Sequence, residues 1–323
     1  MGVIEAHRER LPVGAETPEL SLGEGGTPLV AVPNLGDQLG VELHVKLEGL
    51  NPTGSFKDRG MVVAVAKAVE AGARAVVCAS TGNTAASAAA YAARAGLQAV
   101  VLTPVGAVAT AKRAQSVAAG ARLLDVAGSF DEALRACRAL AEQDGFVLVN
   151  SLNPHRVEGQ KTAVFELLDQ LGRAPDVIAL PYGGGGNLCA FAKGLAEAGA
   201  PTLLVAGEAA ARPTTFASAI RIAEPAHEQE VQALVAAGRA EIVTLADDEL
   251  QRAWADLARE GVFCEPASAA GLAALRRRGV EPGSLAVCIL TGHGLKDAAA
   301  VDRLQVEPTV VEPSLEAILE VLA

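Results

Sequence analysis

Residues 75–103 of the chain, AVVCASTGNTAASAAAYAARAGLQAVVLT, place two short apolar runs on either side of an alanine-rich stretch. The runs at 75–79 and 99–103 have the length and valine content of buried strands. The stretch from 84 to 96 has the pattern of a helix that ends at Gly96. A strand, a helix and a second strand in this order form a βαβ unit with parallel strands. This stretch therefore predicts an α/β fold in which helices pack on a parallel sheet.

The same alternation continues along most of the chain. Ser129, followed three residues later by Glu132, predicts a capping box at one helix start. Residues 208–245 interrupt the alternation and are predicted to form a surface excursion, whereas residues 312–323 are predicted to form a short amphipathic helix on the body or on a partner subunit. The predicted strands are 41–47, 75–79, 99–103, 121–126, 146–149, 176–181, 202–207 and 285–291, and the predicted helices are about 58–72, 84–96, 109–119, 129–144, 155–171, 187–198, 247–260 and 267–278.

The composition is that of a globular protein of about two domains. Half of the 323 residues are apolar and 3% are aromatic, so the core is expected to consist mainly of alanine, valine and leucine. The net charge is −11 and the basic residues are scattered, which argues against a nucleic-acid-binding surface. The N-terminus lacks an apolar segment and no run of 18 uncharged apolar residues follows, so neither export nor membrane insertion is expected. A cytoplasmic location is predicted.

The cysteines are odd in number and widely spaced, and no CxxC or His/Cys ligand spacing occurs. A disulfide framework or a zinc site would need a denser pattern. We therefore expect no metal site and largely buried, reduced thiols at Cys78, Cys137, Cys189, Cys264 and Cys288.

A lysine at a predicted helix start is the first candidate for chemistry. Lys57 follows a polar turn within NPTGSFKDRGM, residues 51–61, in a chain with seven lysines and twenty arginines. An amine can form an imine with an aldehyde, whereas a guanidinium stays protonated and cannot. Taken alone, Lys57 fits an ordinary solvated lysine better, so its candidate role depends on the polar turns elsewhere in the chain.

Ligands of α/β proteins bind at the carboxyl ends of parallel strands, where this chain has four polar turns. The first turn, residues 80–84, carries Ser80, Thr81, Asn83 and Thr84 between a predicted strand and a predicted helix. Its hydroxyls, amide and backbone N–H groups suit a carboxylate or a phenolate-like oxygen. The same residues also fit an ordinary helix N-cap.

The second turn is a run of four glycines, Gly183, Gly184, Gly185 and Gly186, followed by Asn187. Backbone N–H groups of consecutive glycines can surround an anion at a helix start. The dinucleotide fingerprint GxGxxG is absent because Leu188 occupies its third glycine position, and no GK[ST] follows the run. The turn therefore predicts a phosphate site for a ligand that is neither a dinucleotide nor a nucleoside triphosphate.

The third and fourth turns add a hydroxyl and an arginine. Thr291 ends the last predicted strand, where its hydroxyl can pair with a heteroaromatic nitrogen or serve no ligand at all. Asn150, Ser151 and Arg156 follow the strand at 146–149. This set suits a second phosphate because a guanidinium fork matches phosphate oxygens, although Arg156 alone fits a surface charge at a helix start.

Together, Lys57 and the four turns predict a phosphate-bearing aldehyde cofactor, and pyridoxal phosphate meets each requirement. The motifs NPTGSFKDRG, STGNTAAS, NPHRVEGQKT, EPASAA and LTGHGLKD resemble those of threonine synthases, which belong to the tryptophan synthase β-like group of pyridoxal phosphate enzymes. The resemblance extends from about Gly23 to Asp297. Threonine and serine dehydratases are similar around the lysine but typically carry His where this chain has Thr84, whereas the run GGGGN is nearer to the dehydratase form.

The resemblance implies a fold of two three-layer αβα domains with open, twisted, mostly parallel sheets and the cofactor between them. It implies a small domain at 46–149, a large domain formed by 1–45 plus 150–323, and a homodimer. The implied reaction converts O-phospho-L-homoserine and water to L-threonine and phosphate by γ-elimination and β-addition of water.

The resemblance also assigns residue roles. Lys57 would bind the cofactor covalently and carry protons, Asn83 would bind its ring oxygen, and Thr291 would face its pyridine nitrogen. The cofactor phosphate would lie on Gly183, Gly184, Gly185, Gly186 and Asn187, whereas the substrate would contact Ser80, Thr81, Thr84, Asn150, Ser151 and Arg156.

Three alternatives share parts of this pattern. A threonine or serine dehydratase would use Lys57 and the glycine run but would need no second phosphate site. A regulatory protein without catalytic activity could bind a phosphorylated metabolite through the glycine run. An NAD-dependent oxidoreductase is disfavoured because the fingerprint glycine is missing.

Overall fold

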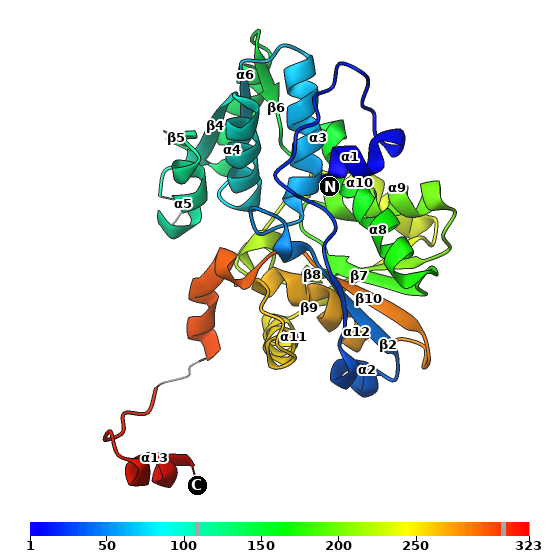
Figure 1. Ribbon diagram of the computed structural model, residues 1–323, viewed down its shortest axis with the longest axis vertical. Coiled ribbons are helices and arrows are strands. Elements are labelled where there is room, and N and C mark those ends of the chain that lie inside the picture. Colours follow the sequence, from blue (N-terminus) through cyan, green and yellow to red (C-terminus); the bar gives the residue numbers. More distant parts are fainter. Residues whose placement is uncertain (107–109, 305–307, 323) are drawn as a thin grey trace.

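In the computed structural model, residues 1–106, 110–304 and 308–322 are described, and their strands form two sheets (Figure 1). The larger sheet has the order β1-β2-β10-β7-β8-β9, and the smaller has the order β5-β4-β3-β6. Every pair is parallel except β1–β2. The strands are β1 (Leu29–Ala31), β2 (Glu42–Leu47), β3 (Ala75–Ala79), β4 (Gln98–Pro104), β5 (Arg122–Val126), β6 (Phe146–Leu148), β7 (Val177–Pro181), β8 (Leu203–Ala209), β9 (Ala240–Leu245) and β10 (Leu285–Leu290).

Helices connect the strands and cover both sheets, which confirms the predicted α/β class. The α-helices are α1 (Val3–His7), α2 (Pro33–Leu39), α3 (Lys57–Glu70), α4 (Asn83–Ala95), α5 (Thr110–Ala118), α6 (Phe130–Ala141), α7 (Pro154–Gln160), α8 (Thr162–Leu171), α9 (Gly186–Ala198), α10 (Glu228–Ala236), α11 (Asp247–Arg259), α12 (Ala270–Arg278) and α13 (Leu315–Leu322). The short 3₁₀ helices are η1 (Arg8–Arg10), η2 (Glu48–Leu50), η3 (Ser218–Ile220), η4 (Pro266–Ala269) and η5 (Gly294–Leu304).

The smaller sheet has helices on both faces, and successive residues of its strands point to these two faces in turn. Val76 and Cys78 of β3 belong to a core cluster with α3 and α4, whereas Val77 and Ala79 belong to a cluster with α6. Apolar side chains of the N-terminal segment join the first of these clusters. The smaller sheet and its helices therefore form three layers.

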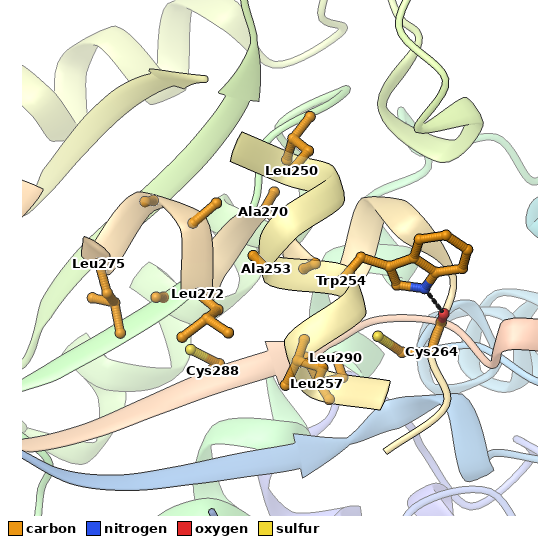
Figure 2. Packing of buried hydrophobic residues seen from close by; sticks show 14 of the residues in the cluster. Leu250, Ala253, Trp254, Leu257, Cys264, Ala270, Leu272, Leu275, Cys288 and Leu290 are labelled. Carbon is orange, nitrogen blue, oxygen red and sulfur yellow. Dashed lines mark hydrogen bonds between the residues drawn. The ribbon is translucent and has the colours of Figure 1, made fainter. Parts of the chain in front are cut away.

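The larger sheet is layered in the same way. Ile178 and Leu180 of β7 pack with α8 and α9, whereas Ala179 packs with α11 and α12. Figure 2 shows the second of these clusters, in which Trp254 projects from α11 and its indole N–H donates to the Cys264 carbonyl at 2.7 Å. A Cβ on Gly271 of α12 would lie 2.8 Å from the Ala179 carbonyl oxygen, so glycine lets this helix lie close to β7.

A close crossing of α3 and α7 positions the later site. A Cβ on Gly60 would lie 2.4 Å from the Arg156 carbonyl oxygen, and one on Gly159 would lie 2.1 Å from the Arg59 carbonyl oxygen. Because real Cβ atoms do not approach other atoms this closely, only glycine fits at either crossing point. The crossing therefore places Arg156 of α7 against the first turn of α3, which begins at Lys57.

The segment 208–245 differs from its prediction. It contains α10 and β9, and β9 pairs in parallel with β8 at the edge of the larger sheet. The prediction of a surface excursion is therefore wrong for its second half. β9 is a short edge strand with two exposed residues, Glu241 and Thr244, so its sequence lacks the continuous apolar run of a central strand. The short edge strand β1 was also not predicted.

Two further predictions differ at the helices. The single helix predicted at 155–171 is two helices, α7 and α8, which meet at Lys161. The predicted C-terminal helix is α13, but none of its residues is buried, and Figure 1 shows it away from the rest of the chain. Packing on the body of the same chain is therefore wrong for α13, and its packing on a partner subunit stays a prediction.

The cysteines are free thiols; four are buried and Cys189 is half-buried. Among the described residues, no group of His, Cys, Asp and Glu side chains is arranged to hold a metal ion. No helix in the described part of the chain has the length and apolar character needed to cross a membrane.

Candidate active site

Lys57 is presented by a loop that side-chain hydrogen bonds hold in place. The loop runs from Asn51 to Lys57, where α3 begins. The carboxylate of Asp58 accepts from the backbone N–H of Thr53 at 2.7 Å, from the Thr53 hydroxyl at 2.6 Å and from the Ser87 hydroxyl of α4 at 2.6 Å. Because Asp58 is one residue after Lys57, these bonds fix the loop and the helix start together.

The same loop is attached to the turn that follows β10. The N–H of Phe56 donates to the Thr291 carbonyl at 2.9 Å, and the N–H of His293 donates to the Gly54 carbonyl at 2.9 Å. The Thr291 side chain is almost fully buried, and its hydroxyl is hydrogen-bonded to that of Ser268 at 3.1 Å. The structure therefore brings Lys57 and Thr291 to one place, as the site prediction requires.

Asn83 lies at the same place, at the head of α4. Its amide donates to both carboxylate oxygens of Glu265, at 3.1 and 3.2 Å. Glu265 is buried beside Gly292, where a Cβ would approach its carboxylate oxygen to 2.2 Å. Gly292 therefore makes room for a carboxylate next to the predicted ring contacts of the cofactor.

The amine of Lys57 is electrostatically tuned. The pKa of Lys57 is lowered to about 7, mainly by desolvation and also by the positive charge of Arg156, while the negative charge of Glu265 opposes both. About half of the amines are then neutral near pH 7. A neutral amine is the form that attacks a carbonyl carbon or accepts a proton, so Lys57 has the properties of a nucleophile and a general base.

The glycine run connects β7 to α9. Gly185 has φ +85°, a left-handed conformation that residues with a side chain rarely adopt. Asn187 lies in the first turn of α9, and its side-chain Nδ2 is buried without a hydrogen-bond partner among the described residues. A buried unpaired donor beside backbone N–H groups at a helix start suits a phosphate, so the loop fits the predicted cofactor.

Residues from the segment 208–245 cover the glycine run, which sequence reasoning missed. A Cβ on Gly183 would lie 3.2 Å from the Ile220 Cα atom, and one on Gly185 would lie 3.0 Å from the His227 Cβ atom. The N–H of His227 donates to the Gly184 carbonyl at 3.1 Å. The only sequence signal of this contact was the run of small residues itself, because glycine allows another segment to approach closely.

The turn after β3 is organised as a helix start. The Ser80 hydroxyl accepts from the N–H groups of Gly82 and Ala85, at 3.2 and 3.3 Å. Ser80 and Thr81 also line a small cavity, and Thr84 is half-buried in the first turn of α4. The Ser80 hydroxyl thus pairs with an N–H of the first turn of α4, although the N-cap residue itself is Gly82, and the predicted contacts of Ser80, Thr81 and Thr84 with substrate stay predictions.

The turn after β6 lies beside the end of β3 and beside the glycine run. The Asn150 amide pairs with the backbone of Ala79, accepting at 3.0 Å and donating at 2.9 Å, so it continues the β3–β6 edge. The Ser151 Cβ atom would lie 3.6 Å from a Cβ on Gly186. The predicted contacts of Asn150 and Ser151 with substrate stay predictions, although Ser151 lies close to the glycine run.

Arg156 is fully buried rather than exposed at the surface. Its Nη1 atom donates to the Val149 carbonyl at 2.8 Å, but Nε and Nη2 have no partner within the described residues. Burial lowers the pKa of Arg156 to about 10, which still leaves the guanidinium charged at neutral pH. A buried cation with two unpaired donors is suited to bind an anion.

A buried ion network supports α3. No local sequence pattern indicates this network. Arg59 donates to Glu48 at 2.7 and 2.8 Å and to Glu166 at 2.7 Å through Nη1 and Nη2, while the Lys46 amine lies 3.2 Å from Glu166. Although burial would raise the pKa of Glu48, the charge of Arg59 lowers it. Two cations and two anions balance here, and they link α3 to β2 and α8.

Comparison with known proteins identifies the family of the chain. Residues 20–292 match the model of the family described as "Pyridoxal-phosphate dependent enzyme". The chain therefore belongs to this family of pyridoxal-phosphate-dependent enzymes.

Within the family, the chain belongs to the threonine synthases. It is 46% identical to the threonine synthase of Halalkalibacterium halodurans, with 99% of this chain and 96% of that protein covered. It is 48% identical to the threonine synthase of Mycobacterium leprae, with 96% and 93% covered. The predicted family, cofactor and enzyme class are thereby confirmed.

Solved structures with this fold include proteins that carry out other reactions. A threonine deaminase, from the source abbreviated T.th., matches with a TM-score of 0.71 and 28% identity, covering 83% of this chain and 92% of that chain. The maize serine racemase matches with a TM-score of 0.76 and 21% identity, covering 94% and 97%. These structures share the fold, while the higher identities belong to threonine synthases.

Proposed function

We propose that the chain is a threonine synthase that converts O-phospho-L-homoserine and water to L-threonine and phosphate. The observation that carries the proposal is the buried Arg156, a second candidate anion site, whose charge acts on Lys57 and whose Nε and Nη2 have no partner within the described residues. A cofactor with one phosphate occupies only one such site. A substrate that itself bears a phosphate accounts for the other.

The residues fit pyridoxal phosphate, which supplies an electron sink for negative charge on substrate carbon when it is bound. Lys57 would hold it covalently. Asn83 and Thr291 would contact its ring. The N–H groups of Gly183, Gly184, Gly185 and Gly186, together with the unpaired amide of Asn187, would hold its phosphate.

Lys57 is the proposed proton carrier. Its Nζ atom, neutral in about half of the molecules near pH 7, accepts protons from Cα and Cβ of the substrate and returns them to Cα and Cγ. The Cγ–O bond breaks and phosphate leaves with the bonding electrons. Water then adds at Cβ through its oxygen and its remaining proton passes to the released phosphate, so the products are threonine and inorganic phosphate.

The remaining polar residues are proposed to bind the substrate ends. Arg156, Ser151 and Thr84 would hold its phosphate, because the guanidinium has two unpaired donors for it. Ser80 and Thr81 would bind its carboxylate at the head of α4. Asn150 would act mainly by fixing the turn that carries Ser151, since its amide is engaged by Ala79.

We also propose that units comprising residues 46–149 and residues 1–45 plus 150–323 close over the substrate and exclude water until phosphate leaves. The first boundary falls inside β2, which pairs within the larger sheet. A homodimer and a cytoplasmic location are proposed as well. Light scattering of the purified protein tests the dimer, and a molar mass of one chain contradicts it.

Parallel assays with O-phospho-L-homoserine and L-threonine test the proposed function. We expect threonine and one equivalent of inorganic phosphate from the first substrate, and little 2-oxobutyrate from the second. Formation of ammonia and 2-oxobutyrate from threonine, without phosphate release from O-phospho-L-homoserine, would show a dehydratase instead.

A substitution separates the same two functions. Arg156→Leu should raise KM for O-phospho-L-homoserine by at least about tenfold, because it removes a charged hydrogen-bonding partner. The same variant should leave any slow elimination of threonine much less affected. Equal losses with both substrates would argue against Arg156 as a phosphate ligand.

A further inference from the structure

The residue before α10, His227, contacts the glycine run through its backbone and its side chain. The backbone N–H of His227 donates to the Gly184 carbonyl at 3.1 Å. In a trans peptide, a carbonyl and the following N–H point in opposite directions. The bond from His227 therefore turns the N–H of Gly185 away from α10, so that this donor faces the other side of the loop.

The imidazole of His227 reaches a second loop. Its Nε2 atom lies 3.0 Å from the Ser151 carbonyl oxygen. Because a carbonyl oxygen only accepts hydrogen bonds, Nε2 carries the hydrogen. A Cβ on Gly186 would lie 3.4 Å from the ring and 3.6 Å from the Ser151 Cβ atom, so the ring occupies the junction of the two loops.

The neighbouring residue fixes the beginning of the glycine run. Tyr182 precedes Gly183 and is almost fully buried, and its hydroxyl donates to the Glu228 carboxylate at 2.6 Å. His227 and Glu228 are adjacent at the start of α10. The start of α10 thus holds the glycine run at both of its ends. Of the two residues, His227 also contacts the turn after β6 that carries Ser151, which is called the Ser151 turn below.

We propose that His227 is a positioning residue that couples the glycine run to the Ser151 turn, so that the cofactor phosphate and the substrate phosphate are presented at a fixed separation. The inference rests on the proposed function, which assigns these two loops to the two phosphates. His227 touches neither phosphate itself. It acts by orienting the Gly184–Gly185 peptide and the Ser151 backbone.

Three substitutions test the role of the imidazole. His227→Leu removes the donor. His227→Gln keeps an N–H at the same number of bonds from Cβ as Nε2, whereas His227→Asn keeps an N–H that is one bond too short. His44→Leu, in β2 and outside the site, is the matched control. Each holoenzyme is titrated with inorganic phosphate, followed by the absorption of the bound cofactor, and is then assayed with O-phospho-L-homoserine.

We expect the Leu and Asn variants to raise both the Kd for phosphate and the KM by about tenfold, with kcat changed by less than about threefold. The Gln variant and the His44→Leu control should stay within about threefold of the unsubstituted protein. Equal losses in the Leu and Gln variants would overturn the inference. So would an unchanged phosphate Kd accompanied only by a lower melting temperature, because that is the result of a purely structural residue.

The two proposals fail in different ways. If the unsubstituted holoenzyme releases no phosphate from O-phospho-L-homoserine, the proposed function fails. The phosphate titration does not depend on turnover, so it still decides whether His227 positions the Ser151 turn.

Discussion

The loop that presents Lys57 and the glycine run are fixed in different ways. Side chains hold the first: Asp58 accepts three hydrogen bonds from Thr53 and Ser87, and the Asn51 amide donates to the Glu48 carbonyl at 2.8 Å. Backbone contacts and packing from a distant segment, including His227, hold the second. A loop held by its own side chains can be recognised in the sequence from its polar residues. The sequence of a loop held through its backbone indicates only the positions where glycine is required.

Removal of the Lys57 amine is the change in the first loop with the largest expected effect on activity. Lys57→Ala should lower turnover of O-phospho-L-homoserine by at least about a thousandfold, because the variant loses both the covalent attachment and the proton carrier. Phosphate release measures the loss, and mass spectrometry after borohydride reduction locates the adduct. An adduct on another residue of the unsubstituted protein, or activity of the variant within about tenfold, contradicts the assignment.

The glycine run should bind the cofactor less tightly when a substitution disfavours its backbone conformation. Gly185→Ala forces a side chain into φ +85° and toward His227, so the Kd for pyridoxal phosphate should rise by about tenfold or more. Gly238→Ala is the matched control, since Gly238 has φ +65° and open surroundings. Both variants should lose stability, but only Gly185→Ala should lose cofactor affinity in an absorbance titration. Equal affinities would show that the run is not the phosphate site.

A subtler change tests the side chains that hold the Lys57 loop. Asp58→Asn replaces an accepting oxygen with an NH₂ group that faces another donor, so the free energy of unfolding should fall by about 1–3 kcal/mol. Denaturant unfolding measures the change. Asp131→Asn, at an exposed position of α6, is the control and should change stability by less than about 0.5 kcal/mol. Comparable effects at both positions would mean that the loop is held mainly by other contacts.

The smallest expected effect is a shift in the pH dependence of cofactor attachment. The rate at which pyridoxal phosphate attaches to the apo-protein should rise with pH through the pKa of Lys57, about 7, because only the neutral amine attacks. The charge of Glu265 raises that pKa, so Glu265→Gln should move the midpoint to lower pH. The charge of Arg156 lowers it, so Arg156→Gln should move the midpoint to higher pH.

Stopped-flow absorbance over a pH series measures both displacements. Because the two substitutions have opposite expected signs, a common effect of misfolding cannot imitate them. Midpoints that move in the same direction would contradict the electrostatic account of Lys57.

Much of the fold was predictable because its signals are local. The strands of the smaller sheet begin or end within one or two residues of their predicted ranges. The capping box at α6 is confirmed, with Ser129 Oγ accepting at 3.2 Å and Glu132 accepting at 2.7 Å. Each of these features depends on neighbours in sequence, and periodicity and capping residues report such neighbours directly.

The misses have a common physical origin. The edge strand β9 carries two exposed polar residues, and α10 precedes it in a stretch rich in polar residues, so neither continued the apolar alternation. The contacts of His227 with Gly184 and Ser151, and those of Arg59 with Glu166, join residues that are far apart in sequence. No local pattern encodes such pairs, because many different residues at each position would give the same local structure.

The sequence alone determined the α/β class, the amine at position 57, the glycine run and the likeness to threonine synthases, since all of these are written in contiguous motifs. The tertiary structure decided which strands pair and which side chains surround the amine. The pKa of about 7 at Lys57 arises from desolvation and from Arg156 and Glu265, which are distant in sequence. Electrostatic environment depends on distances in space, and folding alone sets those distances.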